Sequence, residues 1–294
     1  MTGGTERIGF VGLGIMGRPM ARHLVDAGFL LTVHSRSPDP VDELAEAGAK
    51  RAESPEEVAA DSDVLITMLP DTPDVEQVLF GDRGAAPALP PGALVVDMST
   101  IDPLATRRFA ARLEARGASM VDAPVSGGEK GALEATLSIM VGGRAEDVER
   151  ALPLFRAMGR SIVHVGDSGS GQVAKACNQL VVASTIQAVA EALVLAERSG
   201  VDAARVREAL LGGFAGSKIL EIHGQRMLDR AFAPGFRTRL HLKDARIVMD
   251  TAGTVGAPVP TFAVVAEALR ALVAAGGGDL DHAALYTLVS EGAP

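Results

Sequence analysis

The feature that most constrains the fold of this chain is a set of three glycines, Gly12, Gly14 and Gly17, directly after a short apolar segment. Residues 8–11 have the pattern of a buried strand, and residues 16–27 have helical periodicity. In such a strand–turn–helix unit, the glycines permit a tight turn, a close approach of a pyrophosphate to the backbone, and close packing of helix on strand. The N–H groups at the helix N-terminus would bind the anion. The pattern therefore predicts a dinucleotide site.

The two halves of the sequence have different patterns. Strands are predicted at 8–11, 30–33, 63–69, 94–97, 119–122, 138–141 and 162–165, with helices at 16–27, 41–47 and 103–116 between some of them. This alternation predicts βαβ units and a mostly parallel sheet. After Gly166 only helices are predicted, at 172–200, 203–211, 219–228, 240–251 and 262–274. We therefore predict an α/β domain over residues 1–166 and an all-α domain over residues 167–294, joined by a long helix.

Composition excludes several classes of protein. The 294 residues carry a net charge of −9 without a basic tract, which argues against nucleic acid or an anionic membrane as a partner. A single cysteine, Cys177, can form no intrachain disulfide, which indicates a reducing compartment. Its side chain is expected to be buried in the protein core. The start of the chain lacks a signal pattern, and polar residues interrupt the apolar stretch 181–196, so a cytoplasmic protein with a buried helix is expected. The histidine spacing predicts no metal site.

The end of the second predicted strand bears on the choice of cofactor. An acidic residue there would bind the 2′-hydroxyl of the NAD ribose, but the sequence reads His34-Ser35-Arg36-Ser37. Arg36 could bind the 2′-phosphate of NADP through two hydrogen bonds, with the serine hydroxyls beside it. This favours NADP over NAD, although Asp39 keeps NAD open.

Two further segments carry candidate chemistry. Ser126, Gly127 and Gly128 follow a strand of the first domain and could bind a carboxylate through a hydroxyl and unhindered backbone N–H groups. Lys175 lies in the first turns of the long helix, where the positive end of the helix dipole favours the neutral amine and thus proton transfer. Asn178, three residues on, faces the same side. Lys243 lies in a later predicted helix.

Together these segments resemble the β-hydroxyacid dehydrogenase family over nearly the whole chain. Residues 10–21 resemble its cofactor signature, 122–128 its substrate signature, and Gly171-x-x-x-Lys175-x-x-Asn178 its catalytic signature. The resemblance implies a Rossmann domain, an interdomain helix, and a helical domain that forms homodimers or homotetramers. The cofactor-binding residues expected from the motif, the second strand and the resemblance are Gly12, Leu13, Gly14, Ile15, Met16, Gly17, Ser35, Arg36, Leu69, Pro70, Thr100 and Lys243.

The resemblance also implies an activity, the NAD(P)-dependent reduction of a small carboxylated aldehyde. Lys175 would donate the proton and Asn178 would assist it, while Ser126, Gly127, Gly128 and Lys243 would hold the substrate. Residues 212–217 and 232–244 look like the tartronate semialdehyde reductase branch, which forms glycerate. The alternatives are 3-hydroxyisobutyrate oxidation, reduction of succinic semialdehyde or glyoxylate, and a cofactor-binding protein without turnover. Imine reductases share the first motif but usually lack the lysine.

Overall fold

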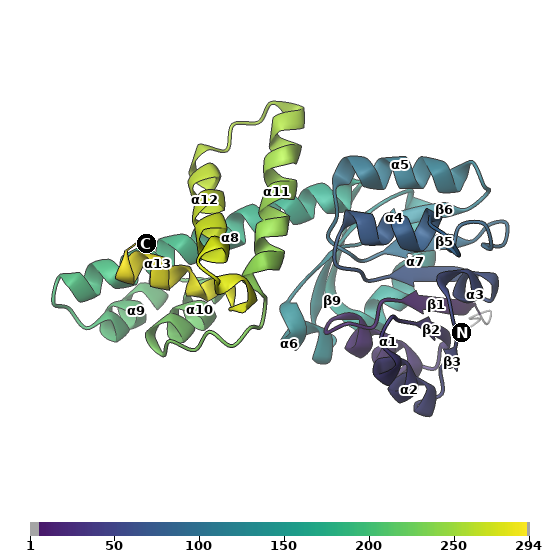
Figure 1. Ribbon diagram of the computed structural model, residues 1–294, viewed down its shortest axis with the longest axis horizontal. Helices are drawn as coiled ribbons and strands as arrows, with labels where there is room; N and C mark the ends of the chain where they lie inside the picture. The colour runs from purple at the N-terminus through teal and green to yellow at the C-terminus, as the bar shows by residue number, and fades with distance from the viewer. Residues whose placement is uncertain (1–5, 293–294) are drawn as a thin grey trace. The chain divides into compact units, whose positions relative to one another are not determined.

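The computed structural model describes residues 6–292, in which the chain divides into two compact units within helix α8 (Ser170–Arg198), between Lys175 and Ala176 (Figure 1). The boundary predicted from the sequence, after Gly166, lies earlier, at the end of strand β9. The first turn of α8 belongs to the first unit, because backbone groups of that turn bind the end of strand β6.

The first unit is built on a mostly parallel sheet, as predicted. Its order is β3-β2-β1-β4-β5-β6-β8-β7, with β9 paired to β8, and the part from β3 to β6 is parallel throughout. Strands β6 and β7 each pair antiparallel with β8. The strands are β1 (Arg7–Val11), β2 (Leu30–His34), β3 (Lys50–Arg51), β4 (Val64–Thr67), β5 (Leu94–Asp97), β6 (Ser119–Asp122), β7 (Val125–Ser126), β8 (Leu137–Gly142) and β9 (Gly159–Gly166).

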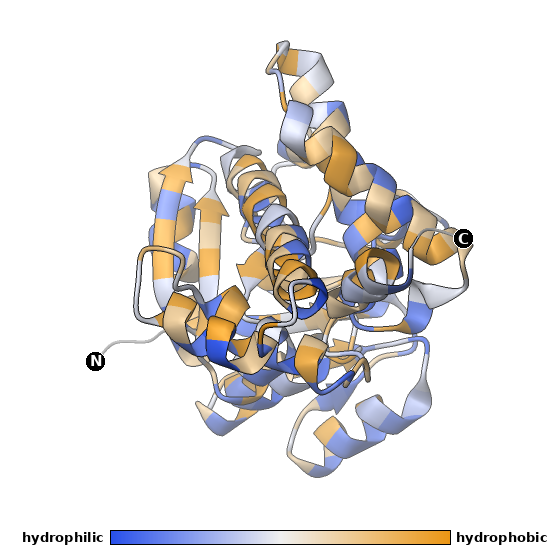
Figure 2. Ribbon diagram, turned by 90° about the vertical axis from the view of Figure 1, so that its left-hand side faces the viewer, coloured by the Kyte–Doolittle hydropathy of each residue, from blue (hydrophilic) through white to orange (hydrophobic). Residues whose placement is uncertain are grey.

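Helices cover both faces of this sheet. Successive residues of a strand point to opposite faces, and the core divides accordingly: Ile66 packs in the cluster that includes α1 and α7, while Leu65 packs in the cluster that includes α4 and α5. Strands buried on both faces are apolar throughout, and most of the arrows in Figure 2 are orange. The helices are α1 (Gly17–Asp26), α2 (Pro38–Glu46), α3 (Pro55–Ala60), α4 (Thr72–Phe80), α5 (Pro103–Glu114), α6 (Gly128–Leu133) and α7 (Ala145–Met158).

The second unit is helical over its described residues, apart from an isolated bridge between Arg237 and Asp281. Its elements are the remainder of α8 (Ser170–Arg198), α9 (Ala203–Leu211), α10 (Lys218–Leu228), α11 (Thr238–Val255), α12 (Pro260–Ala274), η1 (Gly277–Asp279), η2 (His282–Ala284) and α13 (Leu285–Glu291). Helix α8 is long and apolar enough to cross a membrane, a test that core helices also pass. One of its faces, including Ile186 and Leu193, is fully buried in the core of this unit.

The sequence patterns missed the short elements and two longer helices, α4 with nine residues and α7 with fourteen, and they misplaced one residue. Strands β3 and β7 have two residues each, too few for a periodic signal, and α3 and α6 have six. The predicted burial of Cys177 is wrong, because the residue is exposed. It lies on the face of α8 that also carries Val181, whereas the core side begins with Ala176.

Candidate active site

The glycine loop joins β1 to α1 as predicted, and the structure shows why two of its glycines are required. Gly12 has a φ of +104°, and a Cβ there would collide with the carbonyl oxygen of Met68. A Cβ on Gly17 would collide with the carbonyl oxygen of Gly12 itself. At Gly14, by contrast, a Cβ would meet nothing within 4 Å among the described residues. The backbone is therefore open to a ligand at Gly14 and closely packed on either side.

The N-terminus of α1 suits an anion. Its N-cap, Met16, makes no side-chain hydrogen bond to the helix, and the first turn carries no acidic residue. Two other helices of this unit begin differently, since Asp71 caps α4 and Asp102 caps α5. The N–H groups of the first turn of α1 thus receive no side-chain oxygen, and together with the positive end of the helix dipole they fit a pyrophosphate.

The residues predicted to choose the cofactor follow β2. Arg36 is 84% exposed in its side chain and has one long ion pair, 3.9 Å from Nη1 to the carboxylate of Asp74. Ser37 is the N-cap of α2, and Asp39 lies in its first turn. A guanidinium held so weakly could turn toward a phosphate at little cost.

A buried carboxylate ties together the ends of β4 and β5. Asp97 accepts hydrogen bonds at Oδ1 from the hydroxyls of Thr67, at 2.8 Å, and Ser99, at 2.6 Å. The Ser99 hydroxyl in turn accepts a hydrogen bond from the backbone N–H of Leu69, at 2.9 Å. Burial raises the pKa of Asp97 to about 6. The network therefore fixes the loop that carries Leu69 and Pro70 against the loop that carries Ser99 and Thr100.

A second buried carboxylate holds the start of α8. Asp122, at the end of β6, accepts hydrogen bonds from the backbone N–H groups of Gly169, at 2.7 Å, and Gln172, at 2.9 Å. Burial raises the pKa of Asp122 above its usual value, against the effect of these backbone donors. Because Lys175 lies one turn further along α8, Asp122 sets the position of the predicted proton donor relative to the sheet.

The side chain of Gln172 connects the same helix to the Thr100 loop. Its amide donates a hydrogen bond to the carbonyl of Ser99, at 2.8 Å, and accepts one from the N–H of Ile101, at 3.1 Å. The residues on both sides of Thr100 are thereby fixed to α8. Gln172 was not predicted as a functional residue, and Asp122 was predicted only as the first residue of the segment that resembles the substrate signature; both bind the backbone beside predicted site residues.

Lys175 lies in the first turns of α8, as predicted from the sequence, and the structure shows that it is buried. Asn178 lies three residues on, and its amide donates a hydrogen bond to the side-chain oxygen of Gln179, at 2.8 Å. Gln179 donates to the carboxylate of Asp244 on α11, and that carboxylate forms an ion pair with Lys243, at 2.8 Å. A continuous polar chain thus connects Asn178 and Lys243, two predicted site residues, through two residues that the sequence analysis did not single out.

The predicted carboxylate-binding segment is a junction of strand and helix, not a simple turn. Ser126 ends β7, and α6 begins at Gly128, with Gly127 as its N-cap. Both glycines have positive φ, +139° at Gly127 and +61° at Gly128, which residues with a Cβ rarely adopt. Ser126 and Gly127 directly precede the helix, so their polar groups lie at its N-terminal end.

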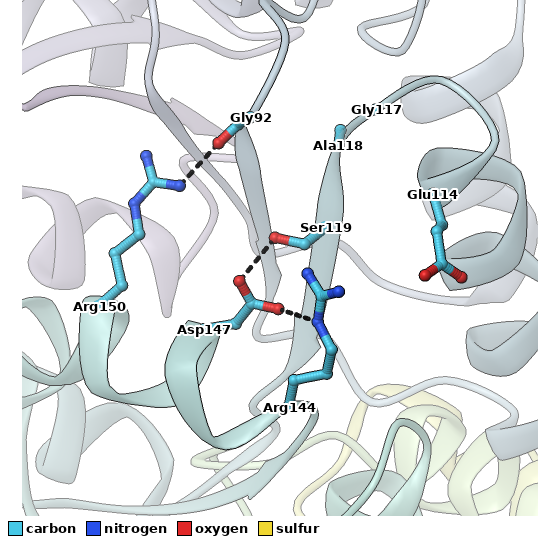
Figure 3. A pocket seen from close by; sticks show the side chains of 8 residues that line it. All are labelled: Gly92, Glu114, Gly117, Ala118, Ser119, Arg144, Asp147 and Arg150. Atoms are coloured by element: carbon cyan, nitrogen blue, oxygen red, sulfur yellow. Dashed lines mark hydrogen bonds and ion pairs between the residues drawn. The ribbon is translucent and has the colours of Figure 1, made fainter.

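The pocket drawn in Figure 3 lies at the amino ends of strands β5 and β6. It is lined by Ser119, which begins β6, and by Arg144 and Asp147 at the start of α7. Asp147 binds both other side chains, and Arg150 donates a hydrogen bond to the carbonyl of Gly92. Ligands of open α/β sheets bind beyond the carboxyl ends of the strands. We therefore regard this pocket as a structural ion-pair network, apart from the candidate site.

Known proteins resemble the chain over both units. Residues 7–166 match the family model of the NAD-binding domain of 6-phosphogluconate dehydrogenase, and residues 169–289 match that described as NAD-binding of NADP-dependent 3-hydroxyisobutyrate dehydrogenase. The 2-hydroxy-3-oxopropionate reductase of Escherichia coli is 48% identical over 95% of each chain. The NAD-dependent L-serine dehydrogenase of Pseudomonas aeruginosa is 37% identical over 96% of this chain and 97% of its own.

A solved structure agrees with these relatives. Mycobacterium tuberculosis 3-hydroxyisobutyrate dehydrogenase, determined with L-serine, superposes with a TM-score of 0.89 at 35% identity, covering 97% of this chain and 99% of its own. The glycine loop, the parallel sheet and the sequence matches all indicate the same family. The chain belongs to the 3-hydroxyisobutyrate dehydrogenase-like family and is an NAD(P)-dependent hydroxyacid dehydrogenase.

Proposed function

We propose that the protein reduces tartronate semialdehyde (2-hydroxy-3-oxopropionate) to glycerate. The observation that carries this proposal is the 48% identity, over 95% of both chains, to the E. coli protein named 2-hydroxy-3-oxopropionate reductase. Residues 212–217 and 232–244, which look like that branch of the family, support it. The reaction consumes one hydride and one proton: the aldehyde carbon gains the hydride, and its oxygen gains the proton.

The residues of the first unit have distinct parts in this proposal. Once bound at Gly14, the cofactor supplies the hydride from its nicotinamide. Lys175 donates the proton to the aldehyde oxygen, and its positive charge stabilises the negative charge that develops there. Ser126, Gly127 and Gly128 bind the substrate carboxylate.

Asn178 and Lys243 assist from the second unit. Because Gln179 and Asp244 connect them, a substrate contact at either residue depends on the same polar chain. We propose that Asn178 donates a hydrogen bond to the substrate or orients Lys175, and that Lys243 contributes a positive charge for the carboxylate or the cofactor.

A second candidate is the oxidation of L-serine. The P. aeruginosa relative is named an L-serine dehydrogenase, and the M. tuberculosis structure was determined with L-serine. Serine, glycerate and 3-hydroxyisobutyrate share a carboxylate and a hydroxymethyl carbon, and differ only in the group on the carbon between them. Specificity therefore depends on what faces that group: an ammonium, a hydroxyl or a methyl.

We also propose NADPH as the preferred cofactor, on the strength of Arg36 and the absence of an acidic residue at positions 34 to 37. An NAD-dependent relative shows that both cofactors occur in proteins of this kind. Arg36→Ala should raise the KM for NADPH by roughly tenfold and leave that for NADH unchanged, because only NADPH carries the 2′-phosphate. Equal effects on both cofactors would count against a role in phosphate binding.

Finally, we propose a homodimer or homotetramer. On α8, Val181 is 60% and Leu195 68% exposed, and Ala188 lies between them on the same face. A stripe of this kind along the longest helix favours burial against a second copy. Light scattering coupled to size-exclusion chromatography should give a mass two or four times that of one chain, whereas a monomer would contradict the proposal.

The test of the proposed reaction is a substrate panel followed through NAD(P)H absorbance. Tartronate semialdehyde, succinic semialdehyde and glyoxylate are reduced with each cofactor, while L-serine and 3-hydroxyisobutyrate are oxidised. The proposal predicts the highest kcat/KM for tartronate semialdehyde with NADPH. A higher value for L-serine would establish the second candidate instead, and no turnover of any substrate with the cofactor bound would favour a protein without catalysis.

A further inference from the structure

Three histidines that lie far apart in the sequence come together in the second unit. His223 is on α10, His241 is on α11 and His282 opens η2. The Nδ1 atoms of His282 and His241 are 2.9 Å apart, and the Nε2 atoms of His282 and His223 are 3.4 Å apart. His282 is thus the middle ring of a row of three imidazoles.

Asp281 completes the cluster at one end. Its carboxylate is fully buried, and Oδ1 lies 3.5 Å from Nδ1 of His223. Its other oxygen is already engaged by Arg226, at 3.1 Å, and by the backbone N–H groups of Gly235 and Phe236. Oδ1 also accepts a hydrogen bond from the N–H of Ala283, at 3.1 Å. The carboxylate is therefore held firmly, with one oxygen facing the imidazole.

The geometry favours a metal ion between two of the rings. Zinc–nitrogen distances of 2.0–2.1 Å place two tetrahedral ligands about 3.3–3.4 Å apart, and the Nε2 atoms of His223 and His282 are 3.4 Å apart. That separation is longer than the usual range for a hydrogen bond to nitrogen or oxygen. One ligand atom each from His223, Asp281 and His282 lies within 4.8 Å of the others.

The remaining ring nitrogens have the partners that metal-bound histidines use. A ligating histidine usually donates its other N–H to a carboxylate or a comparable acceptor, which orients the ring. Here Nδ1 of His223 faces Asp281, and Nδ1 of His282 faces Nδ1 of His241.

We infer that the second unit binds a zinc-class transition-metal ion through Nε2 of His223 and Nε2 of His282, with Asp281 and His241 orienting the two rings. Without metal, the three rings can form a hydrogen-bonded row from His241 through His282 to His223. Metal binding requires only that His282 and His241 change tautomer, which releases no net proton. The side chain of His223 is 15% exposed, which provides a route for the ion and a place for water ligands.

The site connects elements that are distant in the sequence. The ion would join α10 to η2 directly and would reach α11 through His241. Imidazole nitrogens favour zinc, copper and nickel, whereas magnesium prefers oxygen ligands. The site should therefore discriminate between Zn²⁺ and Mg²⁺.

The test uses the untagged full-length protein with Cys177→Ala, which removes the exposed thiol as a competing ligand. Titration calorimetry with Zn²⁺ should show one saturable site per chain at micromolar concentration. In thermal unfolding, Zn²⁺ should raise the Tm by a few degrees, and Mg²⁺ should not. His223→Gln should weaken binding at least tenfold. His164→Gln, a change to an exposed histidine of the first unit, should leave it unchanged.

A spectroscopic measurement keeps the test independent of how the variants fold. Co²⁺ bound to the Cys177→Ala protein should give the intense visible bands of a four-coordinate site, and Zn²⁺ should abolish them. Absence of saturable Zn²⁺ binding, or binding unchanged by His223→Gln, would overturn the inference and leave a hydrogen-bonded row of histidines only.

Discussion

Two buried aspartates, one in each unit, both bind backbone N–H groups, but their pKa values shift in opposite directions. Asp122 binds backbone N–H groups at the start of α8, and Asp281 binds backbone N–H groups around the start of η2. Burial raises the pKa of Asp122. Burial acts in the same direction on Asp281, but the hydrogen bond with His223 and the further partners around it outweigh that effect, and its pKa is lowered.

The difference lies in the side-chain partners. Asp281 faces His223 and His282 and is paired with Arg226, at 3.1 Å, whereas the hydrogen bonds of Asp122 come from the backbone. Removing one member of a buried ion pair leaves the other charge uncompensated, whereas removing a carboxylate that binds only backbone N–H groups leaves neutral donors unsatisfied. A change at Asp281 should therefore cost more stability than the same change at Asp122.

The largest expected loss of stability follows from a change at Asp281, the carboxylate paired with Arg226. Asp281→Asn removes one member of a buried ion pair, and should lower the free energy of unfolding by about 3–5 kcal/mol. Urea unfolding at neutral pH measures it. Asp279→Asn is the matched control, since Asp279 lies two residues away with a side chain 63% exposed and should matter far less. Equal losses of unfolding free energy in the two variants would contradict the importance assigned to the buried ion pair.

The next effect concerns Asp97, a third buried carboxylate, whose hydrogen bonds come from hydroxyls and a backbone N–H. Because folding raises its pKa from 3.8 to about 6, ionisation favours the unfolded chain as the pH rises through this window. Relative to Asp97→Asn, the wild type should lose up to about 3 kcal/mol of stability between about pH 4 and pH 6.

Asp63 provides a control of opposite sign for that measurement. Its hydrogen bonds from Arg7 and its charge interaction with that residue outweigh burial and lower its pKa to about 2. The contribution of Asp63 to the free energy of unfolding should therefore be lost as the pH falls below 3.8, the ordinary pKa of an aspartate. If Asp97→Asn showed the same pH dependence of unfolding as the wild type, Asp97 would not carry the raised pKa.

A smaller loss of stability is expected at Asp122, together with a loss of activity. Asp122→Asn turns an amide N–H₂ toward one of two backbone donors, which should cost about 1–3 kcal/mol. Since the start of α8 would shift with Lys175, kcat should fall roughly tenfold or more, while the Kd for the cofactor stays the same. Asp167→Asn, at an exposed position near the same turn, is the control. A normal kcat in Asp122→Asn would mean that the cap does not position the lysine.

The same contrast shows which features the sequence could predict. The glycine loop and the helix that carries Lys175 are local patterns, since Gly12 to Gly17 and Lys175 to Asn178 each lie within one turn or loop. The contacts of Asp122 with Gly169 and Gln172 span 47 and 50 residues. No periodicity encodes such pairs, so the sequence predicted the helix and its lysine but not what holds them in place.

The histidine cluster was missed for the same reason. His241 and His282 are 41 residues apart, and His223 and His282 are 59 residues apart, so no metal-binding spacing exists in the sequence. Cys177 was assigned to the core because free cysteines are usually buried. Only the packing of α8 shows which of its faces the core covers.

The most direct test of the central claim is the kcat of Lys175→Ala for tartronate semialdehyde with NADPH. We expect a fall of about 10²-fold or more, with the Kd for NADPH unchanged because the glycine loop is intact. Lys130→Ala, which alters a lysine 82% exposed in the same unit, should turn over like the wild type. A kcat near that of the wild type in Lys175→Ala would contradict the assignment of Lys175 as the proton donor.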